Sequence, residues 1–128
     1  ERLKSRFETA FNAFKTLKQM AGEPYSLMMR DATILRFEYT FETVWKFLKE
    51  FLKEKEGKVE NSPKAIFRAY FSAGHLTESE AEQYLQMTDD RNNIVHIYHE
   101  EVAKEIFGRI PSYVKLWEKL FQHLQDKI

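Results

Sequence analysis

The residues best suited to chemistry in this sequence are its four histidines, because only histidine titrates near neutral pH without help from its surroundings. His96 and His99 lie three positions apart, in a segment that also holds charged and amide side chains. His75 follows a glycine in a predicted turn, and His123 lies near the end of the last predicted helix, where a histidine suits the helix dipole. We interpret His75 and His123 as structural, so the segment around His96 is the first candidate for a functional site.

The segment at residues 89–98 departs from the amphipathic pattern of a bundle helix, since it reads Asp-Asp-Arg-Asn-Asn-Ile-Val-His-Ile-Tyr. Extending the apolar row of the residues before it brings Arg91, Asn92 and Val95 onto the inward side. On a straight helix, positions five apart point about 140° away from each other. Arg91 and His96 therefore converge only if the helix is locally distorted or a second chain contributes. Two successive asparagines favour such a distortion, and an ordinary polar helix end is the competing interpretation.

Several other chemistries are excluded by residue type and spacing. A zinc site needs at least one more convergent ligand beside His96 and His99, and their order is not that of a zinc protease. The four glycines are scattered singly, which excludes a glycine-rich phosphate loop, and no serine lies in a nucleophile elbow. The absence of cysteine excludes a disulfide framework, a thiolate metal site and a cysteine nucleophile. We expect no bound metal and no cofactor.

Length and composition set the frame that must position these residues. With 128 residues, the chain is expected to form a single domain over residues 1–128. Twenty basic and twenty acidic residues give zero formal net charge, so the chain as a whole does not attract polyanions. A polyanion must therefore bind a local basic patch. A hydrophobic content of 43%, with eleven phenylalanines, excludes disorder. Apolar residues never run long enough to span a membrane, and we expect a cytoplasmic protein.

The glycines and prolines mark the turns, and the apolar residues between them recur every three or four positions, which is the helical repeat. The sequence therefore predicts an all-α fold, an antiparallel up-and-down four-helix-type bundle with an extra short helix. The lysine- and glutamate-rich run at residues 49–58 is interpreted as a solvated helix end. The predicted helices span residues 2–21, 28–55, 63–73, 78–95 and 100–126, the last with a kink near Pro111.

The segment from Arg91 to His96 also resembles a known motif. It fits the Arg-x(4)-His signature of HEPN domains, and Tyr98 extends it to Arg-x(4)-His-x-Tyr. This longer form resembles that of the HepT toxins, which are paired with a minimal nucleotidyltransferase antitoxin. Residues 30–46, which include Phe37-Glu38 and Trp45-Lys46, are similar to the matching helix of the nucleotidyltransferase substrate-binding proteins. The resemblance extends in order over residues 3–125.

The resemblance implies a helical bundle that forms a homodimer, with the motif arginine and histidine of both chains lining one groove. It implies that Arg91 and His96 are the catalytic residues of a metal-independent ribonuclease. It further implies that Tyr98 accepts adenylyl groups from the partner nucleotidyltransferase. Five further polar residues are expected to support the groove: Asp89, Asn92, Arg30, Asp31 and Glu38.

Three functions are compatible with this sequence. The leading hypothesis is a ribonuclease toxin that cuts RNA and is neutralised by a minimal nucleotidyltransferase antitoxin. The alternative is a non-catalytic subunit that presents a nucleotide or another substrate to that nucleotidyltransferase. A third is an inert dimeric interaction module in which the motif only ends a helix.

Overall fold

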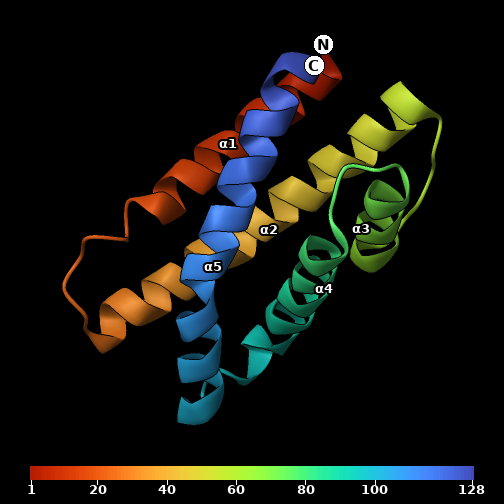
Figure 1. Cartoon of the computed structure of the whole chain (residues 1–128). Coiled ribbons are helices and arrows are strands. Elements are labelled where there is room, and N and C mark those ends of the chain that lie inside the picture. Colours follow the sequence, from red (N-terminus) through yellow and green to blue (C-terminus); the bar gives the residue numbers. More distant parts are fainter.

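The computed structural model describes all of residues 1–128, and it contains helices and no strands (Figure 1). The predicted all-α fold class is thereby confirmed. The predicted helices begin and end within three residues of the observed ones. The elements in chain order are α1 (Arg2–Lys18), α2 (Leu27–Glu56), α3 (Pro63–Ser72), α4 (Glu78–Asn92), the 3-10 helix η1 (Asn93–His96), α5 (Glu100–Leu124) and the 3-10 helix η2 (Gln125–Lys127).

The longest helix, α2, is the central element, because it contacts each of the other four α-helices. Its first turn is capped by Ser26, whose side chain accepts a hydrogen bond from the Met29 N–H at 2.9 Å. Its last turn ends at Gly57, which has φ 66° in the left-handed region that favours glycine. The 30 residues between these caps give α2 a length of about 45 Å, so both ends of the bundle are built on one helix.

The remaining helices pack around α2 in two groups. In Figure 1, α3 and α4 form a hairpin beside α2, while α1 runs along α2 and α5 crosses it and also contacts α4. Phe7 of α1 and Phe121 of α5 are in edge contact, with ring centroids 5.6 Å apart. The two chain ends therefore lie at the same end of the bundle, opposite the end that holds η1 (Figure 1).

The core is held together mainly by aromatic side chains from α2 and α5. Trp117 and Phe37 are fully buried, and their ring centroids lie 5.6 Å apart. Phe37 also stacks on Tyr113 at 5.6 Å. Such pairs each contribute about 0.5–1.5 kcal/mol beyond the area they bury. This packing fixes the register of α5 against α2, and α5 positions one side of the candidate site.

The predicted helix over residues 78–95 is interrupted where the two asparagines favour a distortion, since α4 ends at Asn92 and the chain continues as η1. Two inward positions expected from a continuous helix are wrong. Val95 is 73% exposed and Asn92 is also exposed, whereas Ile94 is buried. The reason is geometric: a 3-10 helix has three residues per turn rather than 3.6, which rotates Ile94 instead of Val95 onto the core side.

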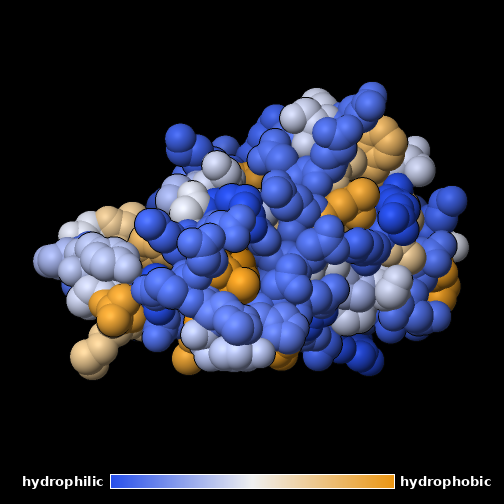
Figure 2. Space-filling model, turned by 90° about the horizontal axis from the view of Figure 1, so that it is seen from below, coloured by the Kyte–Doolittle hydropathy of each residue, from blue (hydrophilic) through white to orange (hydrophobic).

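The last helix contains Pro111, as expected, and its two halves do not share one axis in Figure 1. No helix is both long and apolar enough to cross a membrane. The end of the molecule seen in Figure 2 is mostly hydrophilic, with apolar residues in small separate groups. The exposed polar groups of η1 and of the start of α5 belong to this end of the bundle.

Candidate functional site

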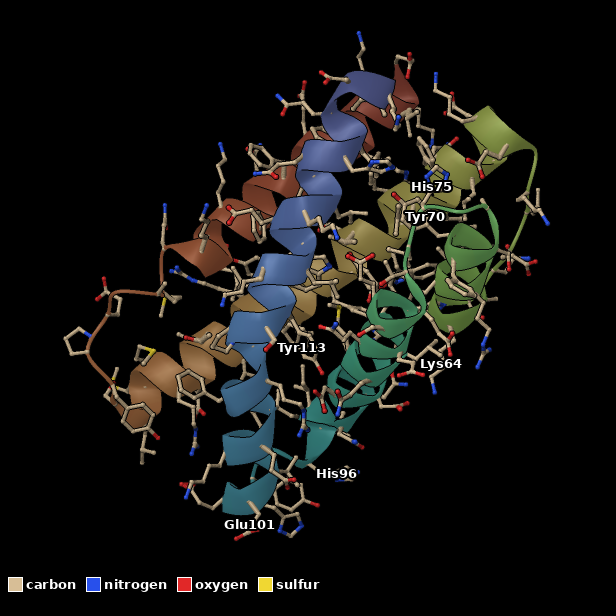
Figure 3. All side chains as sticks on the ribbon, viewed as in Figure 1. Lys64, Tyr70, His75, His96, Glu101 and Tyr113 are labelled. Carbon is tan, nitrogen blue, oxygen red and sulfur yellow. The ribbon has the colours of Figure 1, made fainter.

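The end of α4, the helix η1 and the first turns of α5 enclose an open hollow of about 490 Å³. Its position at the lower end of the molecule can be followed from the label of His96 in Figure 3. Most of the residues that line the hollow have polar side chains, and Val102 and Ile106 contribute aliphatic surface. The polar and aromatic lining residues are Asp90, Asn93, His96, Tyr98, His99, Glu105 and Arg109.

The rim of the hollow is formed by His96 and Tyr98. Both are exposed, Tyr98 to 74%, and the Tyr98 hydroxyl lies 3.5 Å from His96 Nδ1. The Tyr98 ring also packs at an angle against the His99 ring, with centroids 4.3 Å apart. A phenol beside an imidazole can lose its proton to that imidazole when the phenol oxygen attacks an electrophile. The structure thus brings His96 and Tyr98 together on one rim.

Behind the rim, a buried carboxylate joins α4 to α5. Asp90 accepts hydrogen bonds from Arg109 Nε at 2.8 Å, from Arg109 Nη2 at 2.7 Å and from the Tyr113 hydroxyl at 2.6 Å. The Asp90 side chain is 5% exposed, whereas that of Arg109 is 35% exposed and reaches the hollow. Hydrogen bonding to Asp90 raises the pKa of Arg109, and burial followed by the same carboxylate raises the pKa of Tyr113. Arg109 therefore reaches the hollow as part of a fixed ion pair with Asp90.

Sequence analysis did not single out Asp90 or Arg109. Asp90 has the appearance of a surface residue beside Asp89, and the 19 positions between Asp90 and Arg109 give no motif. The one available signal is that Asp90 follows the buried Met87 by three positions, which places it on the same side of α4. A carboxylate on a buried face requires hydrogen-bond donors from a facing helix.

Arg91 lies on a different side of the helix end, against α2. Its Nη1 donates a hydrogen bond to Glu42 Oε2 at 2.8 Å, and its guanidinium lies 4.8 Å from the centre of the Phe41 ring. The same Glu42 accepts a hydrogen bond from Trp45 Nε1 at 3.0 Å. Arg91 Nε is buried without a hydrogen-bond partner. Even with the break at Asn92, Arg91 and His96 do not line one hollow within a single chain.

The expected supporting residues do not gather around His96. Asp89 forms an ion pair with Lys64 of α3 at 2.7 Å, and Asn92 is exposed. Glu38 is half-buried on α2. None of these three residues lines the hollow, so their role in a groove stays a prediction.

Arg30 and Asp31 lie at the start of α2 and form an ion-pair group with the start of α5. Arg30 is buried, and its Nη1 donates to both oxygens of Glu100 at 2.9 and 2.8 Å. Its Nε donates to Asp31 at 3.1 Å. The hydrogen bond to Glu100 is the main cause that raises the pKa of Arg30. This ion-pair group fixes the first turn of α5, directly after Tyr98, against α2.

The other two histidines form a separate group at the far end of α3 and α5. His75 Nδ1 lies 3.3 Å from His123 Nε2, and His75 Nε2 lies 2.6 Å from Glu56 Oε2. Burial is the main cause that lowers the pKa of His123. Figure 3 places His75 well away from His96. No three histidine, aspartate or glutamate side chains anywhere in the chain are arranged to hold a metal ion.

The geometry around Asp90 predicts that its carboxylate stabilises the fold. Replacing Asp90 with alanine leaves Arg109 and the Tyr113 hydroxyl without their acceptor, so we expect the free energy of unfolding to fall by about 3 kcal/mol. Urea unfolding followed by circular dichroism measures this change. Asp89→Ala is the matched control, because its ion pair with Lys64 is exposed and contributes at most about 1 kcal/mol. Equal losses in the two variants would contradict the structural role of Asp90.

Comparisons with known proteins agree with this fold. A crystal structure of a protein from Thermus thermophilus is 46% identical to this chain and superposes with a TM-score of 0.86. The match covers 90% of this chain and 98% of the Thermus chain. No curated protein sequence matches. The family model described as nucleotidyltransferase substrate binding protein like matches residues 4–126, and the chain therefore belongs to that family.

Proposed function

We propose that this protein is a metal-independent ribonuclease toxin of the HEPN type that acts as a homodimer. A partner minimal nucleotidyltransferase acts as the antitoxin by adenylylating Tyr98. The observation that supports this best is the exposed pair of His96 and Tyr98 on the rim of a hollow that Arg109 also lines. Cleavage of RNA requires a proton-transfer group and a cation, and adenylylation requires a nucleophilic hydroxyl. The expected cytoplasmic location stays a prediction.

The cleavage itself needs little from the protein, because RNA provides its own nucleophile. The 2′-oxygen attacks the adjacent phosphorus, the bond to the 5′-oxygen of the next nucleotide breaks, and a 2′,3′-cyclic phosphate and a free 5′-hydroxyl are formed. His96 takes the proton of the 2′-hydroxyl or gives one to the departing 5′-oxygen. Arg91 stabilises the added charge on the phosphorus oxygens by bidentate hydrogen bonds, which a lysine does not reproduce.

The separation of Arg91 from His96 in one chain is the reason that the proposal includes a second chain. A two-fold axis beside the end of α4 brings Arg91 of one protomer toward His96 of the other. Val95, which lies between them in sequence and is 73% exposed, offers an apolar contact for such an interface. The cut is then made by residues of both protomers, and each dimer holds two equivalent sites.

Adenylylation of Tyr98 explains how the partner enzyme stops the cleavage. The Tyr98 oxygen attacks the α-phosphorus of ATP, pyrophosphate leaves, and the phenol proton passes to His96 or to solvent. The attached adenylate places a negative phosphate beside His96 and within the hollow lined by Arg109. A phosphate already bound in the hollow excludes the phosphate of an RNA strand by charge and by space.

A second function is favoured by one observation, the ion pair between Arg91 and Glu42. In the single chain this pair neutralises the arginine that the cleavage requires. If the pair persists in the assembled protein, the chain is a non-catalytic subunit that presents a nucleotide or another substrate to a nucleotidyltransferase. Membership of the nucleotidyltransferase substrate binding protein like family is consistent with this alternative.

The ribonuclease proposal predicts that purified protein cuts total RNA in the presence of EDTA. His96→Ala is expected to lower the cleavage rate by about a hundred- to ten-thousand-fold, because it removes the proton-transfer group. Arg91→Ala is expected to abolish cleavage as well. The readout is the yield of fragments that end in a 2′,3′-cyclic phosphate. His123→Ala is the control, since His123 belongs to a separate hollow.

Circular dichroism verifies that each variant remains helical. If wild type and His96→Ala give the same fragments at the same rate, the ribonuclease proposal is wrong and the non-catalytic subunit becomes the better account. If the wild-type protein does not cut RNA and is not modified by a partner nucleotidyltransferase, the inert dimeric module is the remaining interpretation.

The antitoxin proposal predicts that incubation with the partner nucleotidyltransferase and ATP adds the mass of adenylate at one residue. Tyr98→Phe is expected to lose the adduct, because the substitution removes only the hydroxyl oxygen. Tyr25→Phe is the matched control, since Tyr25 is also strongly exposed but lies between α1 and α2. Intact-mass spectrometry measures the result. An adduct of equal yield on Tyr98→Phe refutes the assignment of Tyr98 as the acceptor.

A further inference from the structure

A second hollow of about 330 Å³ lies between the start of α1 and the second half of α2. Its lining contains five cationic side chains and one carboxylate, whereas the whole chain has no net charge. This concentration of positive charge is therefore local to one surface. We call this surface the basic groove, and its lining residues are Arg2, Arg6, Trp45, Lys46, Lys49, Glu50 and Lys53.

Helical spacing aligns the cations of the basic groove. Lys46, Lys49 and Lys53 recur at three and four positions along one face of α2. Arg2 and Arg6 lie one turn apart on α1, which packs along α2. The two rows therefore form opposite walls of a channel that runs along the helices.

The cationic side chains of the basic groove outnumber the carboxylates that pair with them, since Arg2 and Arg6 share Glu50 and Lys46 lies 3.7 Å from Glu42. The single carboxylate, Glu50, is 14% exposed and lies 3.1 Å from Arg2 Nε and 3.9 Å from Arg6 Nε, so it serves two arginines at once. Neither Lys49 nor Lys53 forms an ion pair. The basic groove therefore keeps an excess of positive charge that suits an anionic partner.

The basic groove also contains an aromatic surface. Trp45 is half-buried, and Lys49 Nζ lies 6.0 Å from the centre of its ring. Its indole nitrogen donates to Glu42, which fixes the orientation of the ring. Proteins that bind single-stranded nucleic acid usually combine a row of positive charges along the nucleic-acid backbone with an aromatic ring on which a base stacks.

The basic groove begins one turn of α2 beyond Glu42, the residue that holds the motif arginine. Glu42 holds Arg91 at 2.8 Å and lies 3.7 Å from Lys46, one turn later on the same face of α2. From residue 42 to residue 53 the face extends over about 16 Å. At about 3.4 Å for each stacked nucleotide, this length accommodates about four or five nucleotides. A strand whose phosphate contacts Arg91 therefore has a path along α2.

We propose that the basic groove binds the sugar–phosphate backbone of single-stranded RNA next to the cleaved bond, with Trp45 as a stacking surface for one base. This inference deepens the proposed function, since the bound strand is the RNA that the motif would cut. The position of the basic groove on α1 and α2 makes it a binding surface separate from the hollow beside His96. An acidic face of a protein partner is the competing occupant, and the experiment includes it.

The test measures binding of a fluorescent single-stranded 2′-O-methyl RNA oligonucleotide by fluorescence anisotropy at several salt concentrations. The blocked 2′-oxygen prevents cleavage, so binding is measured on the otherwise unchanged protein. The test variant is Lys49→Glu with Lys53→Glu. The matched control is Lys104→Glu with Lys115→Glu on α5. It changes the net charge by the same amount as the test variant, and both of its lysines are exposed and form no ion pair.

We expect the test variant to raise Kd about tenfold and to reduce the slope of log Kd against log salt by about 1.4, because two phosphate contacts are lost. The control is expected to keep the Kd and the slope of wild type. A thermal melt verifies folding, and Lys49→Gln with Lys53→Gln replaces the charge reversal if the test variant melts early. The neutral variant is expected to lose the same slope.

Three results would overturn the inference. One is a wild-type protein that does not bind the oligonucleotide, and another is a test variant with the Kd and slope of the control. The third is a test variant that keeps RNA binding but no longer co-elutes with the partner nucleotidyltransferase, which would assign the groove to the protein partner. If unmodified RNA is bound through the groove but never cut, the proposed ribonuclease fails and the RNA-binding groove stands.

Discussion

The buried Asp90 carboxylate is the interaction on which the candidate site depends. A carboxylate removed from water is tolerated only when donors surround it, and here all three hydrogen bonds come from Arg109 and Tyr113 of α5. These bonds hold the end of α4 against the middle of α5. Only residues 93–99 remain to connect the two helices, so they form a 3-10 turn followed by a short exposed segment. The polar side chains of His96 and Tyr98 are displayed on this segment.

The same geometry separates the two motif residues. Arg91 belongs to the last turn of α4 and faces α2, where Glu42 and Phe41 hold it, while His96 follows the break and faces the hollow. A single chain thus places His96 beside Arg109, which is paired with Asp90, and keeps Arg91 on another face. Under the proposed function, the dimer unites them, and Glu42 is shared between Arg91 and the start of the basic groove. This arrangement links cleavage to the surface that would hold the strand.

The sequence predicts the parts of this structure that follow from local patterns. The helical repeat and the positions of glycine and proline give the helices within three residues. The two asparagines favour a distortion, although the predicted helix continues to residue 95 and α4 breaks at residue 92. The consequence of the break for Val95 is not predicted, because it depends on how far the 3-10 turn rotates the chain. Asp90 and Arg109 are not predicted because their pairing joins helices that are distant in sequence. The lysines of residues 49–58 are interpreted from sequence as a solvated helix end, because the local pattern does not show what packs beside them. Only the fold brings Arg2 and Arg6 of α1 next to these lysines.

Under the proposed function, the active site is assembled from two chains, and an experiment that mixes two inactive variants tests this assembly. Arg91→Ala and His96→Ala proteins, each inactive alone, are mixed under conditions that allow protomers to exchange, and RNA cleavage is measured. If each site takes its arginine from one chain and its histidine from the other, a mixed dimer holds one intact site. The mixture is then expected to recover about a quarter of wild-type activity, because about half of the dimers are mixed. Confirmed exchange of protomers without any recovery of cleavage would contradict the shared site.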